Sequence, residues 1–118
     1  MALKIKRVYA TALPEDGYRI LTDRLWPQGE SKEKAAIDFW AKEIAPSNAL
    51  RTAFHHAGMS FEEFQKRYRE ELSANPYTNE FRALVKKHLM YGSVTLVYAS
   101  KNETQNEAVI LKALLEQP

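Results

Sequence analysis

One short apolar segment near the end of the chain, "SVTLVYAS" at residues 93–100, constrains the fold more than any other feature. The segment is almost continuously apolar, is rich in β-branched residues and is bounded by turn residues. This pattern is typical of a strand that is covered on both faces. We therefore expect a central strand in a sheet that helices flank.

Three earlier segments are candidates for the other strands. "LKIKRVY" (3–9) alternates apolar and polar residues, which predicts a strand with one wet face near a sheet edge. "YRILTD" (18–23) follows a loop at 12–17 that contains proline and glycine, and it reads as a second strand. "IDFWAKEI" (37–44) fits either a strand or the continuation of a helix. We favour the strand, and Pro46 ends either version.

Five segments have helical signals. Ser31 can cap a short helix at 31–36, and Ser47 or Asn48 can cap another through Phe54. Ser60 and Glu63 have the spacing of a capping box, with a helix behind them that stops at 75–76. An apolar stripe at 81–89 predicts the next helix, which Gly92 closes. Thr104 and Glu107 give a second capping-box pattern, ahead of a helix through residue 115.

The order of these elements predicts the fold class. Strands come first, then a block of helices, then the apolar strand and a last helix. A connection as long as the helical block favours parallel pairing between the last strand and an earlier one. We expect a compact three-layer α/β or α+β domain, with a small, mostly parallel sheet of about four strands. The 118 residues form one domain, 1–118.

Composition excludes several classes of protein. The absence of cysteine excludes disulfides, thiolate catalysis and cysteine-bound metal, and it fits a cytoplasmic protein. No apolar run approaches the roughly 20 residues that span a bilayer, and the first residues lack the pattern of a signal peptide. Seventeen Lys and Arg against fifteen Asp and Glu is too balanced to indicate nucleic acid from charge alone.

Polar side chains cluster where the predicted strands end. In open α/β sheets, ligands bind outside the carboxyl ends of the strands. We therefore expect one ligand-binding edge built from three separate segments of the chain. The candidate residues are Asp23, Arg24, Trp26, Lys42, Ser47, Arg51, Lys101 and Asn106.

The charges of these candidates suggest an anionic ligand. Arg24, Lys42 and Lys101 would form a positive cluster, and the start of the last helix would add unpaired amides. Asp23 could orient the guanidinium of its neighbour or act as a base. Plainer roles compete with these: Asp23 and Arg24 as a structural ion pair, and Trp26 as a packing residue.

Other kinds of chemistry have little support. The sequence has no Gly-x-Ser-x-Gly elbow and no glycine-rich phosphate loop. The adjacent His55 and His56 point apart and no His-x-x-x-His spacing exists, so we expect no metal site. The residues select neither a reaction nor a cofactor nor an oligomeric state.

A second hypothesis is a non-catalytic module that binds a protein or a nucleic acid. Its surface would combine two basic stretches, Lys4, Lys6 and Arg7 with Lys66, Arg67 and Arg69. The aromatic residues that single-strand readers interleave with basic ones are absent from both stretches, which weakens the nucleic-acid version.

Four motifs resemble a known family. "DRLWPQG" (23–29), "WAKEIAPSNALR" (40–51), "FEEFQKRYREEL" (61–72) and "VTLVYASKNETQNEAVIL" (94–111) resemble the YeaO-like family of small bacterial proteins, domain of unknown function 488. The resemblance covers nearly the whole chain and implies the fold, but no reaction. The family pattern maps onto Asp23, Arg24, Trp26, Pro27, Gly29, Trp40, Lys42, Pro46, Ser47, Arg51, His56, Lys101 and Asn106.

The chain departs from that family pattern in two places. Gln28 stands where most members have arginine, which removes one positive charge from the expected cleft. Longer relatives have a Cys-His-Arg element after the last strand, whereas this chain has Asn106-Glu107-Ala108. The resemblance therefore does not imply thiol chemistry here.

Overall fold

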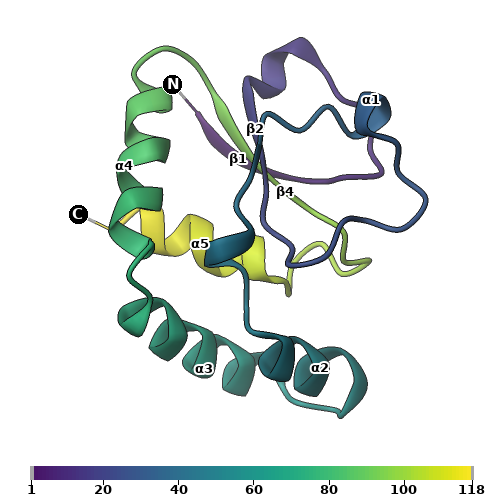
Figure 1. Ribbon diagram of the computed structural model, residues 1–118, viewed down its shortest axis with the longest axis vertical. Coiled ribbons are helices and arrows are strands. Elements are labelled where there is room, and N and C mark those ends of the chain that lie inside the picture. Colours follow the sequence, from purple (N-terminus) through teal and green to yellow (C-terminus); the bar gives the residue numbers. More distant parts are fainter. Residues whose placement is uncertain (1, 118) are drawn as a thin grey trace.

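The computed structural model describes residues 2–117 and contains a four-stranded sheet in which every pair of neighbouring strands is parallel (Figure 1). The sheet has the order β1-β4-β2-β3, with bounds Leu3–Arg7 for β1, Val94–Tyr98 for β4, Tyr18–Leu21 for β2 and Phe39–Trp40 for β3. The apolar segment is thus an inner strand with a partner on each side, and every residue of it is buried. Both expectations, a buried inner strand and β1 at a sheet edge, are confirmed.

The helices lie unevenly on the two faces of the sheet (Figure 1). Their bounds are α1 Lys32–Ala35, α2 Asn48–His56, α3 Phe61–Ala74, α4 Thr78–Leu89 and α5 Glu107–Leu115, with 3₁₀ turns η1 at Pro14–Asp16 and η2 at Lys42–Ile44. Helices α2 to α5 contribute to the main core, whereas only α1 and loops cover the other face. No helix within residues 2–117 is long and apolar enough to cross a bilayer. The predicted α/β architecture is confirmed.

Alternation along the strands explains why the two faces differ. Successive strand residues point to opposite faces of a sheet. Ile20 and Leu96 point to the main core, together with Phe64, Tyr68 and Leu111 from the helices. The residues between them on the strands face the other way and include the buried polar side chains of the second face, so that face is held by polar contacts as well as packing.

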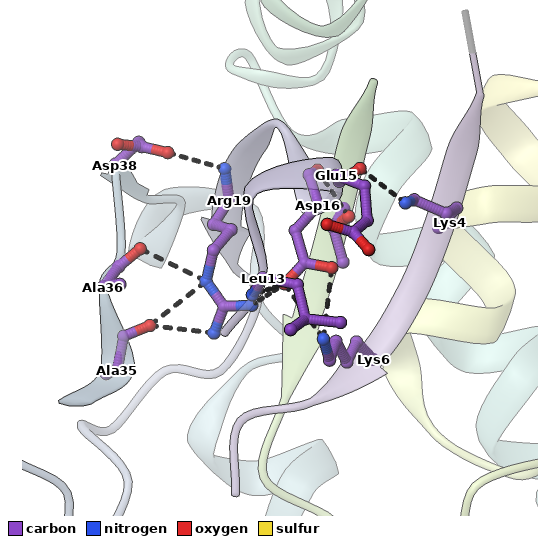
Figure 2. A network of polar contacts seen from close by, with 10 residues as sticks. Lys4, Lys6, Leu13, Glu15, Asp16, Arg19, Ala35, Ala36 and Asp38 are labelled. Atoms are coloured by element: carbon purple, nitrogen blue, oxygen red, sulfur yellow. Dashed lines mark hydrogen bonds and ion pairs between the residues drawn. The ribbon is translucent and has the colours of Figure 1, made fainter. Parts of the chain in front are cut away.

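A buried ion pair is the centre of the second face (Figure 2). The Arg19 guanidinium lies 2.7 Å from Asp16, and Lys6 lies 3.0 Å from the same carboxylate. Arg19 also donates to the carbonyl of Ala35 at the end of α1. Burial alone would raise the pKa of Asp16, but the Leu13 amide and the two cations together lower it. The network therefore fastens η1, β1, β2 and α1 to one another.

Gly17 brings this network against the central strand. Its φ of 68° lies in the left-handed region, and a Cβ at this position would lie 2.0 Å from the carbonyl oxygen of Ser93. Only glycine fits both requirements. The close approach lets Tyr18 donate to the same Ser93 carbonyl at 2.9 Å, which starts the pairing of β2 with β4.

Two expected elements differ in extent from the structure. Within residues 37–44 the favoured strand forms, but only Phe39 and Trp40 belong to it. The chain then turns into η2, where the carbonyl of Ile44 accepts a hydrogen bond from the buried Tyr68 hydroxyl. At α3, Ser60 caps the helix as expected, but the Glu63 carboxylate pairs with Arg67. Glu63 thus forms an ion pair with Arg67 on the surface of the helix in place of the second hydrogen bond of the capping box.

The second capping-box prediction is wrong. Asn106, not Thr104, caps α5 by accepting a hydrogen bond from the amide of Val109. The Asn102 side chain holds the amide and hydroxyl of Thr104, so that Thr104 is not available as a cap. The shift makes Glu107 the first residue of the helix and turns its side chain toward the sheet.

The Asp16 network predicts a large cost for removing its anion. Asp16→Asn would leave Arg19 as a buried cation without its carboxylate, so we expect the free energy of unfolding to fall by about 3 kcal/mol at about pH 7. Urea denaturation measures this change. Glu63→Gln is the matched control at an exposed ion pair, and we expect it to change stability by less than about 0.5 kcal/mol. Equal effects of the two substitutions would contradict the role given to Asp16.

Candidate functional site

A small cavity lies where β2 and β4 end. Its volume is about 20 Å³, and its lining residues are Asp23, Arg24, Pro46, Arg51, His55, Phe64 and Glu107. Asp23 follows β2, whereas Glu107 begins α5 and Arg51 lies on α2. The cavity is therefore built where three segments distant in sequence meet, at the carboxyl ends of the strands.

Two carboxyl groups form one wall of the cavity. Glu107 is 4% exposed, and its carboxylate accepts a hydrogen bond from the Thr22 hydroxyl at 2.8 Å. Asp23 accepts a hydrogen bond from the Ala99 amide at 2.8 Å, which ties it to the end of β4. The two carboxyl groups also lie within hydrogen-bonding reach of each other. A hydrogen bond between two carboxyl groups requires a proton, so the pair shares a proton when one of the two groups is protonated.

The surroundings of the two groups decide where that proton resides. Burial raises the pKa of Glu107 well above its ordinary value, and the charge of Asp23 raises it further. Burial also raises the pKa of Asp23, but hydrogen bonds from Glu107 and the Ala99 amide and the charge of Arg51 oppose that rise. Glu107 therefore keeps its proton to higher pH than Asp23 does, and Asp23 is the first of the two to ionise.

Arg24 is fixed by the backbone rather than by a carboxylate. Its guanidinium donates to the carbonyl of Pro46 at 2.8 Å and to that of Ala45 at 3.1 Å. These bonds hold the segment that leads into α2 against the end of β2. The Asp23 carbonyl accepts a further hydrogen bond from the Trp40 indole at 2.7 Å, so the expected Asp23–Arg24 ion pair is replaced by backbone contacts on both sides.

Arg51 brings the second positive charge to the cavity. Its Nε is buried and has no hydrogen-bond partner among residues 2–117. Its charge acts on Asp23 and on His55, one turn further along α2. Partial burial and the charges of Arg51 and His56 lower the pKa of His55, so this imidazole takes up a proton at lower pH than an ordinary histidine does.

The structure brings together only part of the expected set. Asp23, Arg24 and Arg51 line the cavity. Ser47 lies in a neighbouring hollow, where it caps α2 and donates from its hydroxyl to Glu71. Arg24 thus meets Arg51 at the cavity, rather than meeting Lys42 and Lys101.

The other four expected residues lie away from the cavity. Lys42 places its ammonium 5.0 Å from the centre of the Trp40 ring. Trp26 packs edge-on against the same ring and donates to the carbonyl of Glu30. Asn106 is the cap of α5 and bonds the carbonyl of Asn102, and Lys101 is exposed. None of the four lines the cavity.

Sequence reasoning did not select Glu107 or His55. The sequence pattern places Glu107 in a capping box, because an acid three residues after a threonine at a helix start is the usual signature. A signal was present, since Glu107 precedes the strongly apolar run "AVIL" and thus lies on a helix that is buried. The sequence suggests His55 only as a metal ligand, whereas its position on α2, one turn after Arg51, is what brings it to the cavity.

Comparisons with known proteins identify relatives along the whole chain. A family profile described as "Inactive DUF488-N3 subclade" matches residues 2–118. The uncharacterized protein YeaO of Escherichia coli K12 is 43% identical over 111 residues, which cover 94% of each chain. The uncharacterized protein Rv3073c of Mycobacterium tuberculosis H37Rv is 37% identical over 113 residues, which cover 96% of this chain and 92% of the relative. No solved structure is significantly similar to the chain.

The carboxyl pair predicts a particular dependence of stability on pH. Because the pKa of Glu107 is raised in the folded protein, folding favours its protonated form. Its contribution to stability is complete below its unfolded pKa, near 4.5, and is lost as pH rises through the folded value. Glu107→Gln mimics the protonated form and has no such loss. We therefore expect the difference in melting temperature, Glu107→Gln minus wild type, to be more positive at about pH 8 than at about pH 5.

The exposed Glu103, four residues earlier, provides the matched control. Glu103→Gln removes the same charge from the loop before α5, and we expect its melting temperature to follow that of wild type at every pH. Differential scanning fluorimetry across the pH range makes the comparison. A difference between Glu107→Gln and wild type that does not change with pH would show that Glu107 ionises normally.

Proposed function

The chain belongs to the DUF488 family, in the subclade described as inactive, and on that basis we propose that it is a non-catalytic protein that binds a small oxyanion at the cavity between β2, α2 and α5. The ligand would carry a carboxylate or phosphate group, and one oxygen of that group would bind beside Arg51. The lack of cysteine suits a reducing compartment, so the proposal places the protein in the cytoplasm.

The observation that carries this proposal is the unpaired donor of Arg51. A buried donor without an acceptor costs about 1–3 kcal/mol, and more when the group is charged. The Nε–H of Arg51 is such a donor within the part of the chain that the structure describes. An oxyanion is the acceptor that matches a guanidinium best, because the hydrogen bond is then charge-assisted.

The charges around the cavity support an anion. The guanidinium groups of Arg24 and Arg51 line the cavity together with two carboxyl groups, and burial raises the pKa of each carboxyl. The raised pKa values delay the second negative charge of the pair to higher pH, so the pair compensates less of the positive charge of the arginines. The remaining negative charge of Asp23 opposes an anion, so binding should strengthen when acid protonates the pair a second time.

The size of the cavity limits what can enter. About 20 Å³ is close to the minimum for one water molecule. A whole phosphate group does not fit, but a single oxygen does, with the rest of the ligand outside. His55 is exposed and lies at the lining, so its imidazole can contact the outer part of the ligand.

An enzymatic role is the alternative that the same residues suggest. A carboxyl group that keeps its proton at neutral pH is suited to general acid catalysis. However, Glu107 already uses its carboxyl to accept from Thr22 and to pair with Asp23. These contacts join β2 to α5, so we assign the pair a structural task and the arginines the binding task.

Binding to nucleic acid through the basic stretches has less support. On β1, Lys6 is bound to Asp16 and Arg7 donates to the carbonyl of Ser100. On α3, Arg67 is paired with Glu63. Since these charges are engaged within the chain, they contribute less to a surface that attracts phosphates.

The proposal predicts that anions stabilise the wild-type protein and not an Arg51 variant. We expect phosphate, sulfate and acetate at about 100 times their dissociation constant to add about 2.7 kcal/mol to the free energy of unfolding. Arg51→Met should weaken binding at least about tenfold, because a charge-assisted hydrogen bond is lost. Calorimetric titration and thermal shift measure both effects.

Lys101→Met is the matched control for this experiment. It removes the same charge from an exposed position that does not line the cavity, so we expect anion binding to stay as in wild type. The proposal fails if no anion shifts the wild type, or if the Lys101 and Arg51 variants lose binding equally.

A further inference from the structure

A second pocket, with a different character, lies beside the edge strand β3. Its volume is about 250 Å³. The lining residues are Phe39, Ala41, Glu43, Ile44, Tyr77, Glu80, Phe81 and Leu84. They come from β3, from η2 and from the beginning of α4, and none of them lines the cavity at Arg51. The pocket is therefore a separate feature of the fold.

The pocket has an apolar floor and an aromatic mouth. Ala41, Ile44 and Phe81 are buried and form part of the main core. Phe39 is 40% exposed and Tyr77 is 46% exposed. β3 pairs with β2 on one side only, so its outer edge carries no further strand among the described residues. The aromatic rings are thus accessible beside a hydrophobic hollow.

Two carboxylates complete the lining. Glu43 and Glu80 are both exposed, and neither has an ion-pair partner within residues 2–117. Lys42, which precedes Glu43, places its ammonium against the Trp40 ring, and Arg82, two residues after Glu80, donates to the carbonyl of Leu114. Negative charge at an apolar, aromatic pocket attracts cations, both by Coulomb interaction and through the ring faces.

From this combination we propose that the pocket binds a small organic cation, an ammonium or guanidinium group on an aryl or alkyl body. The body occupies the hollow between Ile44, Phe81 and Leu84, and the charged head lies at Glu43 and Glu80. An engineered cavity of about 150 Å³ holds benzene, so 250 Å³ has room for a ring with a short chain.

The same features exclude other ligand classes. An organic anion of the same shape meets two like charges at Glu43 and Glu80. A neutral apolar molecule fills the hollow but displaces water from the carboxylates without replacing its hydrogen bonds. The cation is the one class that gains from both the apolar floor and the charged rim.

Titration of the ¹⁵N-labelled full chain with three probes that share a 2-phenylethyl body tests this site. The probes are phenethylammonium, 2-phenylethanol and 3-phenylpropanoate, which share a phenyl ring and differ in charge. We expect the cation to shift amide signals in residues 39–44 and 77–84 and to bind at least about tenfold more tightly than the anion, in line with the energies of ion and ring contacts. Equal binding of all three probes, or no binding of the cation, overturns the proposal.

Variants separate the charge from the apolar contact. The double variant Glu43→Gln/Glu80→Gln should bring phenethylammonium to the affinity of phenylethanol and leave phenylethanol unchanged. Glu33→Gln, an exposed charge on α1, is the matched control and should leave both affinities as in wild type. If the double variant retains the full preference for the cation, Glu43 and Glu80 are not its site. Both glutamates are exposed, so the double variant is expected to fold.

Discussion

The contact between the carboxyl groups of Asp23 and Glu107 is the interaction on which the candidate site depends. Asp23 is bound to the end of β4 through the Ala99 amide, and Glu107 is bound to the end of β2 through Thr22. The backbone amide of Thr22 also donates to the carbonyl of Val97 on β4. Two strand ends and the first turn of α5 therefore meet at one shared proton. If both carboxyls were charged, their repulsion at a buried position would push α5 away from the sheet.

The frame of the fold follows from local signals in the sequence. The continuous apolar run at residues 93–100 identifies β4, because only a strand covered on both faces needs apolar residues at every position. Ser31, Ser47 and Ser60 each cap the helix that the sequence predicts for them. These features depend on neighbours within a few residues. They can therefore be predicted without knowledge of the packed structure.

Which side chains form the site depends on contacts between residues that are distant in the sequence. The strand-end rule indicates the right edge of the sheet, but it does not say which side chains reach the cavity. Arg24 is directed by two backbone carbonyls from residues 45–46, and Lys42 by the Trp40 ring. Glu107 turns inward because Asn106 takes the capping position. No periodic pattern in the sequence indicates which of these partners each side chain binds.

Two of the hollows of the molecule have opposite character, a small one with arginines and an apolar one with glutamates at its rim. The shared proton is the feature that connects stability and anion binding, since an anion beside Arg51 favours the protonated pair and so raises its pKa. Carboxyl ¹³C signals of Asp23 and Glu107, followed through a pH titration with and without phosphate, report this directly. We predict that Glu107 titrates well above 4.5 and that phosphate moves its midpoint upward. Midpoints near the ordinary values of 3.8 and 4.5, unchanged by phosphate, would contradict the account.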